Sequence, residues 1–182
     1  MGNPAETAAF GQRKEGVGEK FMTFKIVSIS NEYATRMRST MRDDFGRPVI
    51  EQTATGYGPC RVSLKLFVPG EDKRLLLTYT PFTADNAFNQ PGPIYIHQKE
   101  VAQYSDIHRF PSEIKADKVH FPLSLIGYNK AQEMIFSKLV HDADVDELIE
   151  QIFDESPSVE FLHARNSEPC CFICTIERAE IN

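Results

Sequence analysis

The sequence predicts an α+β fold, a single domain in which one amphipathic helix packs on a mainly antiparallel sheet. Three observations support this class. Short apolar or alternating runs typical of strands recur along the chain. The segments between them are short and contain turn-forming residues. Only one segment has a clear helical periodicity, and consecutive strands joined by tight turns favour antiparallel pairing.

The domain is expected to begin near the first strand pattern. Residues 1–20 are rich in Gly, Ala and charged side chains and have no hydrophobic periodicity, so we expect a mobile N-terminal extension there. Residues 21–182 are predicted to form one domain. At 182 residues with 41% hydrophobic side chains, the chain is long enough to bury a core without disulfides or a metal.

The first half of the folded region shows a strand at 21–29, a segment at 31–42 that fits a short helix or a loop, and a short strand at 94–97. Residues 60–67 alternate as CRVSLKLF, and residues 74–80 form a Leu-rich run. The turn-like sequence VPGED between them predicts that these two runs form a hairpin.

The second half contains the strongest helix signal. Apolar side chains at Val145, Leu148, Ile149, Ile152 and Phe153 follow the spacing of one helical face. Asp142 or Asp144 is expected to cap the N-terminus of this helix. Strands are predicted at 123–128 and 134–140, which form a hairpin, and at 159–165 and 171–178, which form another around residues 166–170.

Several short motifs recur in one order along the chain: Pro59-Cys60-Arg61 with Ser63-Leu64, Pro69-Gly70-Glu71, the run from Leu75 to Tyr79, Gly92-Pro93-Ile94-Tyr95, and then His163, Arg165, Cys171 and Arg178. With these motifs the chain resembles a bacterial family known as domain of unknown function 1203, from Met22 to the C-terminus. It departs from the family pattern at Phe88, where a Tyr is common, and at Ile126, where an Arg is usual. The resemblance implies no activity.

The last predicted hairpin provides the main candidate site. Side chains alternate along a strand, so His163 and Arg165 share one face. If residues 166–170 form the loop, Arg165 lies opposite Cys171 and His163 lies opposite Ile173. This register would place Arg165, His163 and the Cys171 sulfur together as an anion site or an activated, catalytic cysteine. The alternative is a polar pair at the sheet edge with an inert thiol.

Arg61 is a further candidate ligand-binding side chain. On the predicted strand it projects away from Cys60, which is expected to lie in the core. Arg61 could equally form an ion pair with Glu71. No metal site is expected, because Cys171 and Cys174 would point to opposite faces of a strand and the histidines are scattered.

The charge and the missing motifs narrow the function classes. A net charge of −6 makes nucleic acid a poor partner, and no apolar run is long enough to predict a membrane helix. We expect a cytoplasmic protein with reduced cysteines and no cofactor. Our leading hypothesis is a domain that binds a small anion through Arg165 and His163, with Arg61 as a further candidate. The alternative is a noncatalytic protein-interaction domain, and the oligomeric state is left open.

Overall fold

The computed structural model describes residues 22–180, which form two sheets and three helices. The larger sheet has five strands in the order β1-β8-β7-β5-β6. They are β1 (Met22–Val27), β5 (Leu123–Tyr128), β6 (Met134–Leu139), β7 (Phe161–Asn166) and β8 (Phe172–Glu180). All neighbouring strands are antiparallel, which confirms the predicted α+β class. The expected extension at residues 1–20 lies outside the described residues.

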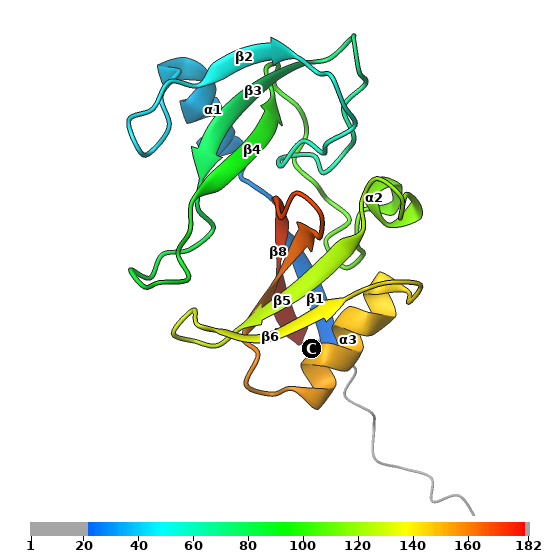
Figure 1. Cartoon of the computed structure of the whole chain (residues 1–182). Coiled ribbons are helices and arrows are strands. Elements are labelled where there is room, and N and C mark those ends of the chain that lie inside the picture. Colours follow the sequence, from blue (N-terminus) through cyan, green and yellow to red (C-terminus); the bar gives the residue numbers. More distant parts are fainter. Residues whose placement is uncertain (1–21, 181–182) are drawn as a thin grey trace, which may run out of the picture.

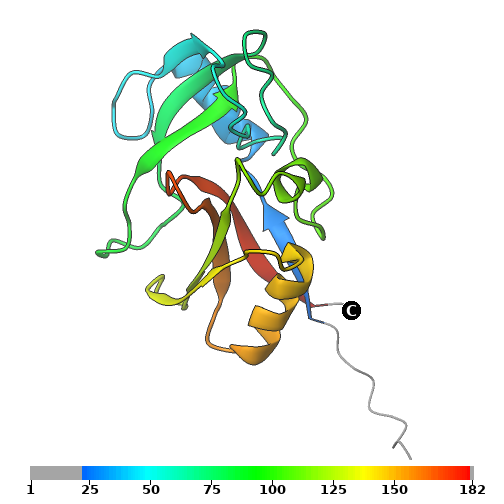
Figure 2. The same cartoon turned by 45° about the vertical axis from the view of Figure 1, so that its right-hand side comes forward.

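The smaller sheet has three antiparallel strands in the order β2-β3-β4. They are β2 (Ile50–Thr53), β3 (Lys73–Tyr79) and β4 (Gly92–His97). Figure 1 shows this sheet and α1 (Asn31–Thr40) at one end of the molecule, and the larger sheet with α3 (Val145–Glu155) at the other. The two ends remain separate after rotation in Figure 2, so their separation is not an effect of one viewpoint.

Helix α3 confirms the strongest prediction from the sequence. The Asp144 carboxylate caps it by accepting hydrogen bonds from the N–H groups of Asp146 at 2.9 Å and Glu147 at 3.2 Å. The buried side chains of the helix are Val145, Leu148, Ile149, Ile152 and Phe153. The helix therefore packs the predicted apolar stripe into the core below the larger sheet.

Helix α1 resolves the segment that fitted either a helix or a loop. The Ser30 side chain caps it by accepting a hydrogen bond from the Tyr33 N–H at 3.1 Å. Ala34 and Met37, three residues apart, are fully buried. They join the hydrophobic cluster that includes Leu75 on β3. The half-buried Tyr33 also packs against this cluster, whereas Glu32, Thr35 and Arg36 are exposed.

The predicted strand at residues 60–67 is wrong. This segment forms consecutive tight turns, with Leu64 at φ 54 and its N–H donating to the Cys60 carbonyl at 2.8 Å. Every side chain from Cys60 to Leu64 is buried, whereas a strand on one sheet face alternates between buried and exposed. Strand β3 therefore pairs with β2, which its polar sequence IEQT did not predict, and with β4.

The turn segment 59–66 connects the two hydrophobic clusters of the molecule. Val62 belongs to the cluster of the smaller sheet, and Leu64 belongs to the cluster under the larger sheet. Its backbone is held by hydrogen bonds, since the Arg61 N–H donates to the Tyr95 carbonyl at 3.0 Å and its carbonyl accepts from Ile29. The segment is therefore a rigid junction, and it determines where Cys60 and Arg61 lie.

Candidate functional site

The C-terminal hairpin has a different register from the predicted one. Arg165 lies opposite Phe172 and not opposite Cys171, because β8 contains a bulge, with Ile173 as the extra residue between the partners of Ala164 and Arg165. The Asn166 N–H donates to the Cys171 carbonyl at 3.1 Å, so the loop consists of residues 167–170, one fewer than expected. Three consecutive side chains, Phe172 to Cys174, are buried at the bulge, and in the sequence they form an apolar run that does not reveal the register.

His163 lies deep in the molecule. It is opposite Thr175, not Ile173 as predicted, and it is fully buried. Neither ring nitrogen has a hydrogen-bond partner. Its ring contacts four aromatic side chains, Phe82, Tyr128, Phe161 and Phe172. Burial, with a smaller contribution from the nearby Arg165 charge, lowers the pKa of His163 to about 3, so its imidazole is neutral at physiological pH.

Arg165 is half-buried at the end of β7, where two cavities meet. Its Nη1 atom donates to the Cys170 carbonyl at 3.1 Å. The Nε atom is buried and has no hydrogen-bond partner. A buried N–H without a partner is unfavourable, and a ligand acceptor at this position would satisfy it. Arg165 is therefore the predicted site residue that both lines these cavities and retains unused donor capacity.

The larger of these two cavities has a volume of about 410 Å³. Among its described lining residues, Arg165 is the only charged one. The hydroxyls of Ser124 and Ser167 form a hydrogen bond of 2.7 Å on its wall. Phe88 and Ile126, the two positions where the chain departs from the family pattern, also line it. The cavity thus combines one positive charge with hydroxyl groups and apolar walls.

Tyr128 also lines this cavity and lies close to Arg165. Burial raises the pKa of the Tyr128 hydroxyl, and the Arg165 guanidinium opposes that rise without cancelling it. Tyr128 therefore keeps its proton at physiological pH and adds no negative charge to the cavity. The local field remains that of Arg165.

The smaller cavity, of about 50 Å³, is lined by Arg165 together with Cys170 and Cys171. The structure thus brings Arg165 and Cys171 to the same cavity, although they are not paired across the hairpin. The Cys171 thiol is half-buried and lies 3.6 Å from the Pro169 carbonyl. The volume accommodates a water molecule or a small group of a ligand.

Arg61 does not line these cavities. It is buried and donates from Nε to the Phe172 carbonyl at 2.6 Å and from Nη1 to the Pro59 carbonyl. The predicted ion pair with Glu71 does not occur among the described residues, and Arg61 does not project into solvent. Burial lowers the pKa of Arg61 to about 10, so it keeps its charge. Arg61 connects the turn segment 59–66 to the start of β8.

A second cluster, which the sequence analysis missed, lies beside the smaller sheet. The Cys60 sulfur accepts a hydrogen bond from the backbone N–H of His97 at 3.4 Å. The Nε2 atom of the His97 ring lies 3.5 Å from an Asp72 carboxylate oxygen. All three residues lie in or just after segments that carry the family resemblance. Their positions in or near these motifs were the signal that the sequence offered for this cluster. The incorrect prediction of a strand at residues 60–67 prevented its recognition.

The members of this cluster influence one another's protonation. Burial raises the pKa of the Cys60 thiol, but hydrogen bonds from His97 and from the backbone N–H groups of Ser63 and Val62 outweigh it and lower the pKa to about 7. Burial lowers the pKa of His97, but the adjacent Cys60 thiol and Asp72 carboxylate outweigh it and raise the pKa. A thiolate and an imidazolium therefore stabilise each other here.

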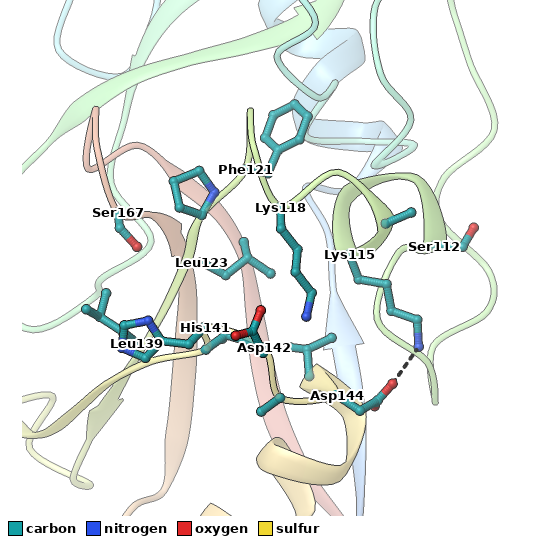
Figure 3. Close-up of a pocket in the computed structure, with 15 residues that line it drawn as sticks. Ser112, Lys115, Lys118, Phe121, Leu123, Leu139, His141, Asp142, Asp144 and Ser167 are labelled. Carbon is teal, nitrogen blue, oxygen red and sulfur yellow. Dashed lines mark ion pairs between the residues drawn. The ribbon is translucent and has the colours of Figure 1, made fainter.

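The largest cavity, about 800 Å³, lies between α2 (Ser112–Ala116), the end of β6 and the start of α3. Figure 3 shows lysine and aspartate side chains around the same opening. Lys115 is 3.6 Å from the Asp144 carboxylate and also forms an ion pair with Asp146. Because Asp142 and Asp144 balance the charges of Lys115 and Lys118 on the lining, this cavity favours an anion less than the Arg165 cavity does.

Residues 22–180 contain no group of three His, Cys, Asp or Glu side chains arranged to hold a metal ion. Among these same residues, no helix is long and apolar enough to cross a membrane.

The comparisons with known proteins identify the family. A model described as "Protein of unknown function (DUF1203)" matches residues 57–178, so the chain belongs to this family. No curated protein and no solved structure matches the chain. The matched range includes Cys60, Asp72, His97 and the whole C-terminal hairpin.

Proposed function

We propose that this protein binds a small anion, such as a phosphorylated or carboxylated metabolite, in the cavity beside Arg165. One observation carries the proposal: Arg165 is the only charged side chain among the described lining residues, and its Nε atom is buried without a partner. An anionic oxygen would satisfy that donor and form a charge-assisted hydrogen bond. The hydroxyls of Ser124 and Ser167 supply further hydrogen bonds to a ligand.

His163 and Arg61, the other two predicted residues, support this site without contacting the anion. A neutral His163 contributes no charge to the anion, but its ring packs among the aromatic side chains that border Arg165. Arg61 holds the beginning of β8 through the Phe172 carbonyl. Both are positioning residues, and Arg165 is the residue that contacts the ligand.

Catalysis at Cys171 is a further step of the proposal. Cys171 and Arg165 line the smaller cavity, whereas Cys171 does not line the larger one, so this step requires a small group of the bound anion to extend past Arg165 into the smaller cavity. Rapid alkylation of Cys171 in the native protein, slowed in Arg165→Ala, would support a nucleophilic role. If Cys171 is alkylated only after unfolding, the site binds without catalysis.

A thermal-shift screen tests the binding site, with inorganic phosphate and sets of phosphorylated and carboxylated metabolites as probes. A ligand at 100 times its dissociation constant adds about 2.7 kcal/mol of stability, which is easily detected. Arg165→Ala should abolish the shift, and Arg165→Lys should restore little of it if the guanidinium binds in a bidentate manner.

Lys118→Ala is the matched control, because Lys118 lies at the largest cavity and not at the Arg165 cavity. It should leave the shift unchanged. Loss of the shift in Lys118→Ala but not in Arg165→Ala would place the ligand in the largest cavity and refute the proposal.

A protein-interaction role is the second candidate, because strand β6 leaves one edge of the larger sheet open. Of its side chains, Met134, Ile135 and Leu139 are exposed. At the opposite edge of the sheet, the Ile26 N–H of β1 donates a hydrogen bond of 2.7 Å to the Ile107 carbonyl, so part of this edge is already paired. An open apolar edge is prone to pair with another strand.

We propose a second copy of this chain as the occupant of the β6 edge. Antiparallel pairing about Ser137 would place Ile135 beside Leu139 of the other copy, and Lys138 beside Phe136, so no like charges meet. The Val140 N–H points to β5, so the amide of Ser137 points outward by alternation. Ser137→Pro should therefore abolish a dimer in sedimentation experiments, whereas Ser137→Thr should retain it. A wild-type monomer at high concentration would refute this role.

A further inference from the structure

The Cys60 sulfur lies in a pocket of hydrogen-bond donors. It accepts the His97 N–H at 3.4 Å and also interacts with the backbone N–H groups of Val62 and Ser63. The turn at residues 61–63 brings these two amides close to the sulfur. A cradle of amide donors favours a negatively charged sulfur.

The His97 side chain lies beside this sulfur and is linked to a carboxylate. Its Nε2 atom is 3.5 Å from Asp72 Oδ2, and Asp72 is itself fixed by the Val68 N–H at 2.8 Å. His97 is only 7% exposed, and its Nδ1 atom is buried without a hydrogen-bond partner. The Cys60 thiol is the polar neighbour of this ring, and Nδ1 keeps capacity for a hydrogen bond to a molecule that reaches the sulfur.

Two arginines add positive charge around Cys60. Arg61 and Arg38 both interact electrostatically with this sulfur. Arg38 also donates to the His97 carbonyl at 3.1 Å, which connects it to the same strand end. The charged groups that act on Cys60 are therefore the two guanidiniums and the His97 ring, and Asp72 acts through that ring.

Cys174 provides a control within the same molecule. Both Cys174 and Cys60 are 0% exposed, so their access to solvent is matched. Cys174 lies in the apolar core under the larger sheet, and no hydrogen bond to its sulfur is found among the described residues. Burial raises the pKa of the Cys174 thiol to about 12, although Arg61 opposes the rise.

We propose that Cys60 is a site of oxidation by small hydroperoxides, with His97 as the proton donor to the departing oxygen. The Cys60 thiolate attacks one oxygen of hydrogen peroxide, so that an S–O bond forms and the O–O bond breaks. The sulfur is oxidised by two electrons to a sulfenic acid, and the peroxide is reduced. The departing hydroxide takes the proton of the His97 imidazolium and leaves as water.

The burial of Cys60 selects for a small oxidant. Hydrogen peroxide is little larger than water and reaches buried sulfur through brief local openings, which admit bulky alkylating reagents far less often. The amide N–H groups stabilise the attacking thiolate, and the His97 ring supplies the proton to the departing oxygen. The same surroundings are absent around Cys174, so burial alone does not produce this reactivity.

The test measures oxidation of the two buried cysteines in one protein. The full chain with Cys170→Ser and Cys171→Ser is treated with hydrogen peroxide at neutral pH, and each remaining cysteine is followed by peptide mass mapping. Cys60 should be oxidised at least tenfold faster than Cys174, and the first product should be reversed by a thiol reductant. Equal rates, or oxidation of Cys60 only in denaturant, would overturn the proposal.

A variant then tests the role of His97. His97→Gln should slow Cys60 oxidation by about tenfold or more and leave Cys174 unchanged, because the proton donor is lost. Asp72→Asn provides a milder variant that removes only the carboxylate, and it should shift the pH–rate profile of Cys60 while the melting temperature stays close to wild type. A Cys60 rate unchanged in both folded variants would refute the assignment of His97 as proton donor.

Discussion

One buried cysteine and one buried histidine lie in the larger sheet and another such pair lies at the smaller sheet, but the two pairs differ in protonation. Beside the smaller sheet, the pKa of Cys60 is lowered to about 7 and the pKa of His97 is raised. In the larger sheet, the pKa of Cys174 is raised to about 12 and the pKa of His163 is lowered to about 3. These shifts favour the charged forms of Cys60 and His97 and the neutral forms of Cys174 and His163.

Burial disfavours charge at both places, so depth does not explain the difference. Cys60 and His97 lie next to each other and next to backbone N–H donors. Cys174 and His163 sit on adjacent strands but point to opposite faces of the sheet, since Cys174 is paired with the residue after His163. The comparison teaches that the polar neighbours of a buried group, rather than its exposure, determine its charge in this protein.

The largest expected effect is a difference in thiolate content between the two cysteines. With pKa values of about 7 and about 12, the thiolate fractions of Cys60 and Cys174 at about pH 8 should differ by about 10,000-fold. Ultraviolet thiolate absorbance of the Cys170→Ser, Cys171→Ser protein should show one titration near neutrality, lost in Cys60→Ser and retained in Cys174→Ser. A titration that survives Cys60→Ser would break the comparison.

The next effect concerns the acid stability of the larger sheet. The unfolded chain binds a proton at His163 below about pH 6.5, whereas the folded protein does so only near pH 3, so stability falls as the pH drops through this window. The loss attributable to this group is at most about 5 kcal/mol. Urea unfolding should show that His163→Leu removes this loss, and the exposed His141→Gln should not. An unchanged acid profile in His163→Leu would contradict the neutral assignment.

Serine substitutions should separate the two cysteines by a smaller amount. Cys174→Ser buries a hydroxyl without a partner and should cost about 1–3 kcal/mol of unfolding free energy. Cys60→Ser should cost less than about 1 kcal/mol near pH 6, because its oxygen still accepts the His97 N–H. Denaturant unfolding of the two variants measures both values. A larger cost at Cys60 than at Cys174 would mean that the donors around Cys60 do not serve a hydroxyl.

The smallest effect is expected at Asp72, which is partly exposed and screened by solvent. Asp72→Asn should lower the pKa of His97, because one of the charges that raises it is removed. The change should be under about one unit. Nuclear magnetic resonance titration of the His97 ring measures it, with Glu71→Gln as the neighbouring control. A larger change in the pKa of His97 in Glu71→Gln than in Asp72→Asn would contradict the prediction, because Glu71 would then be the carboxylate that acts on His97.

The sequence determined the features that depend on neighbouring residues. Helix α3 followed from a stripe of five apolar side chains and an Asp cap, which reflect the 3.6-residue period of any α-helix. The β5–β6 hairpin followed from two strand-like runs around a turn that Asn129 stabilises by accepting two backbone hydrogen bonds. Alternating side chains also predicted a strand at residues 60–67. That prediction failed, because this segment forms buried tight turns whose sequence shows the same alternation.

Only the tertiary structure decided which chemical groups meet. Cys60, Asp72 and His97 come from a turn, a loop and a strand end, and no local pattern encodes their distances. The register of Arg165 depended on a bulge in β8, which the apolar run from Phe172 to Cys174 does not reveal in the sequence. Residue types and short-range periodicity are properties of the chain, whereas desolvation and contacts between distant segments arise only when the chain is packed.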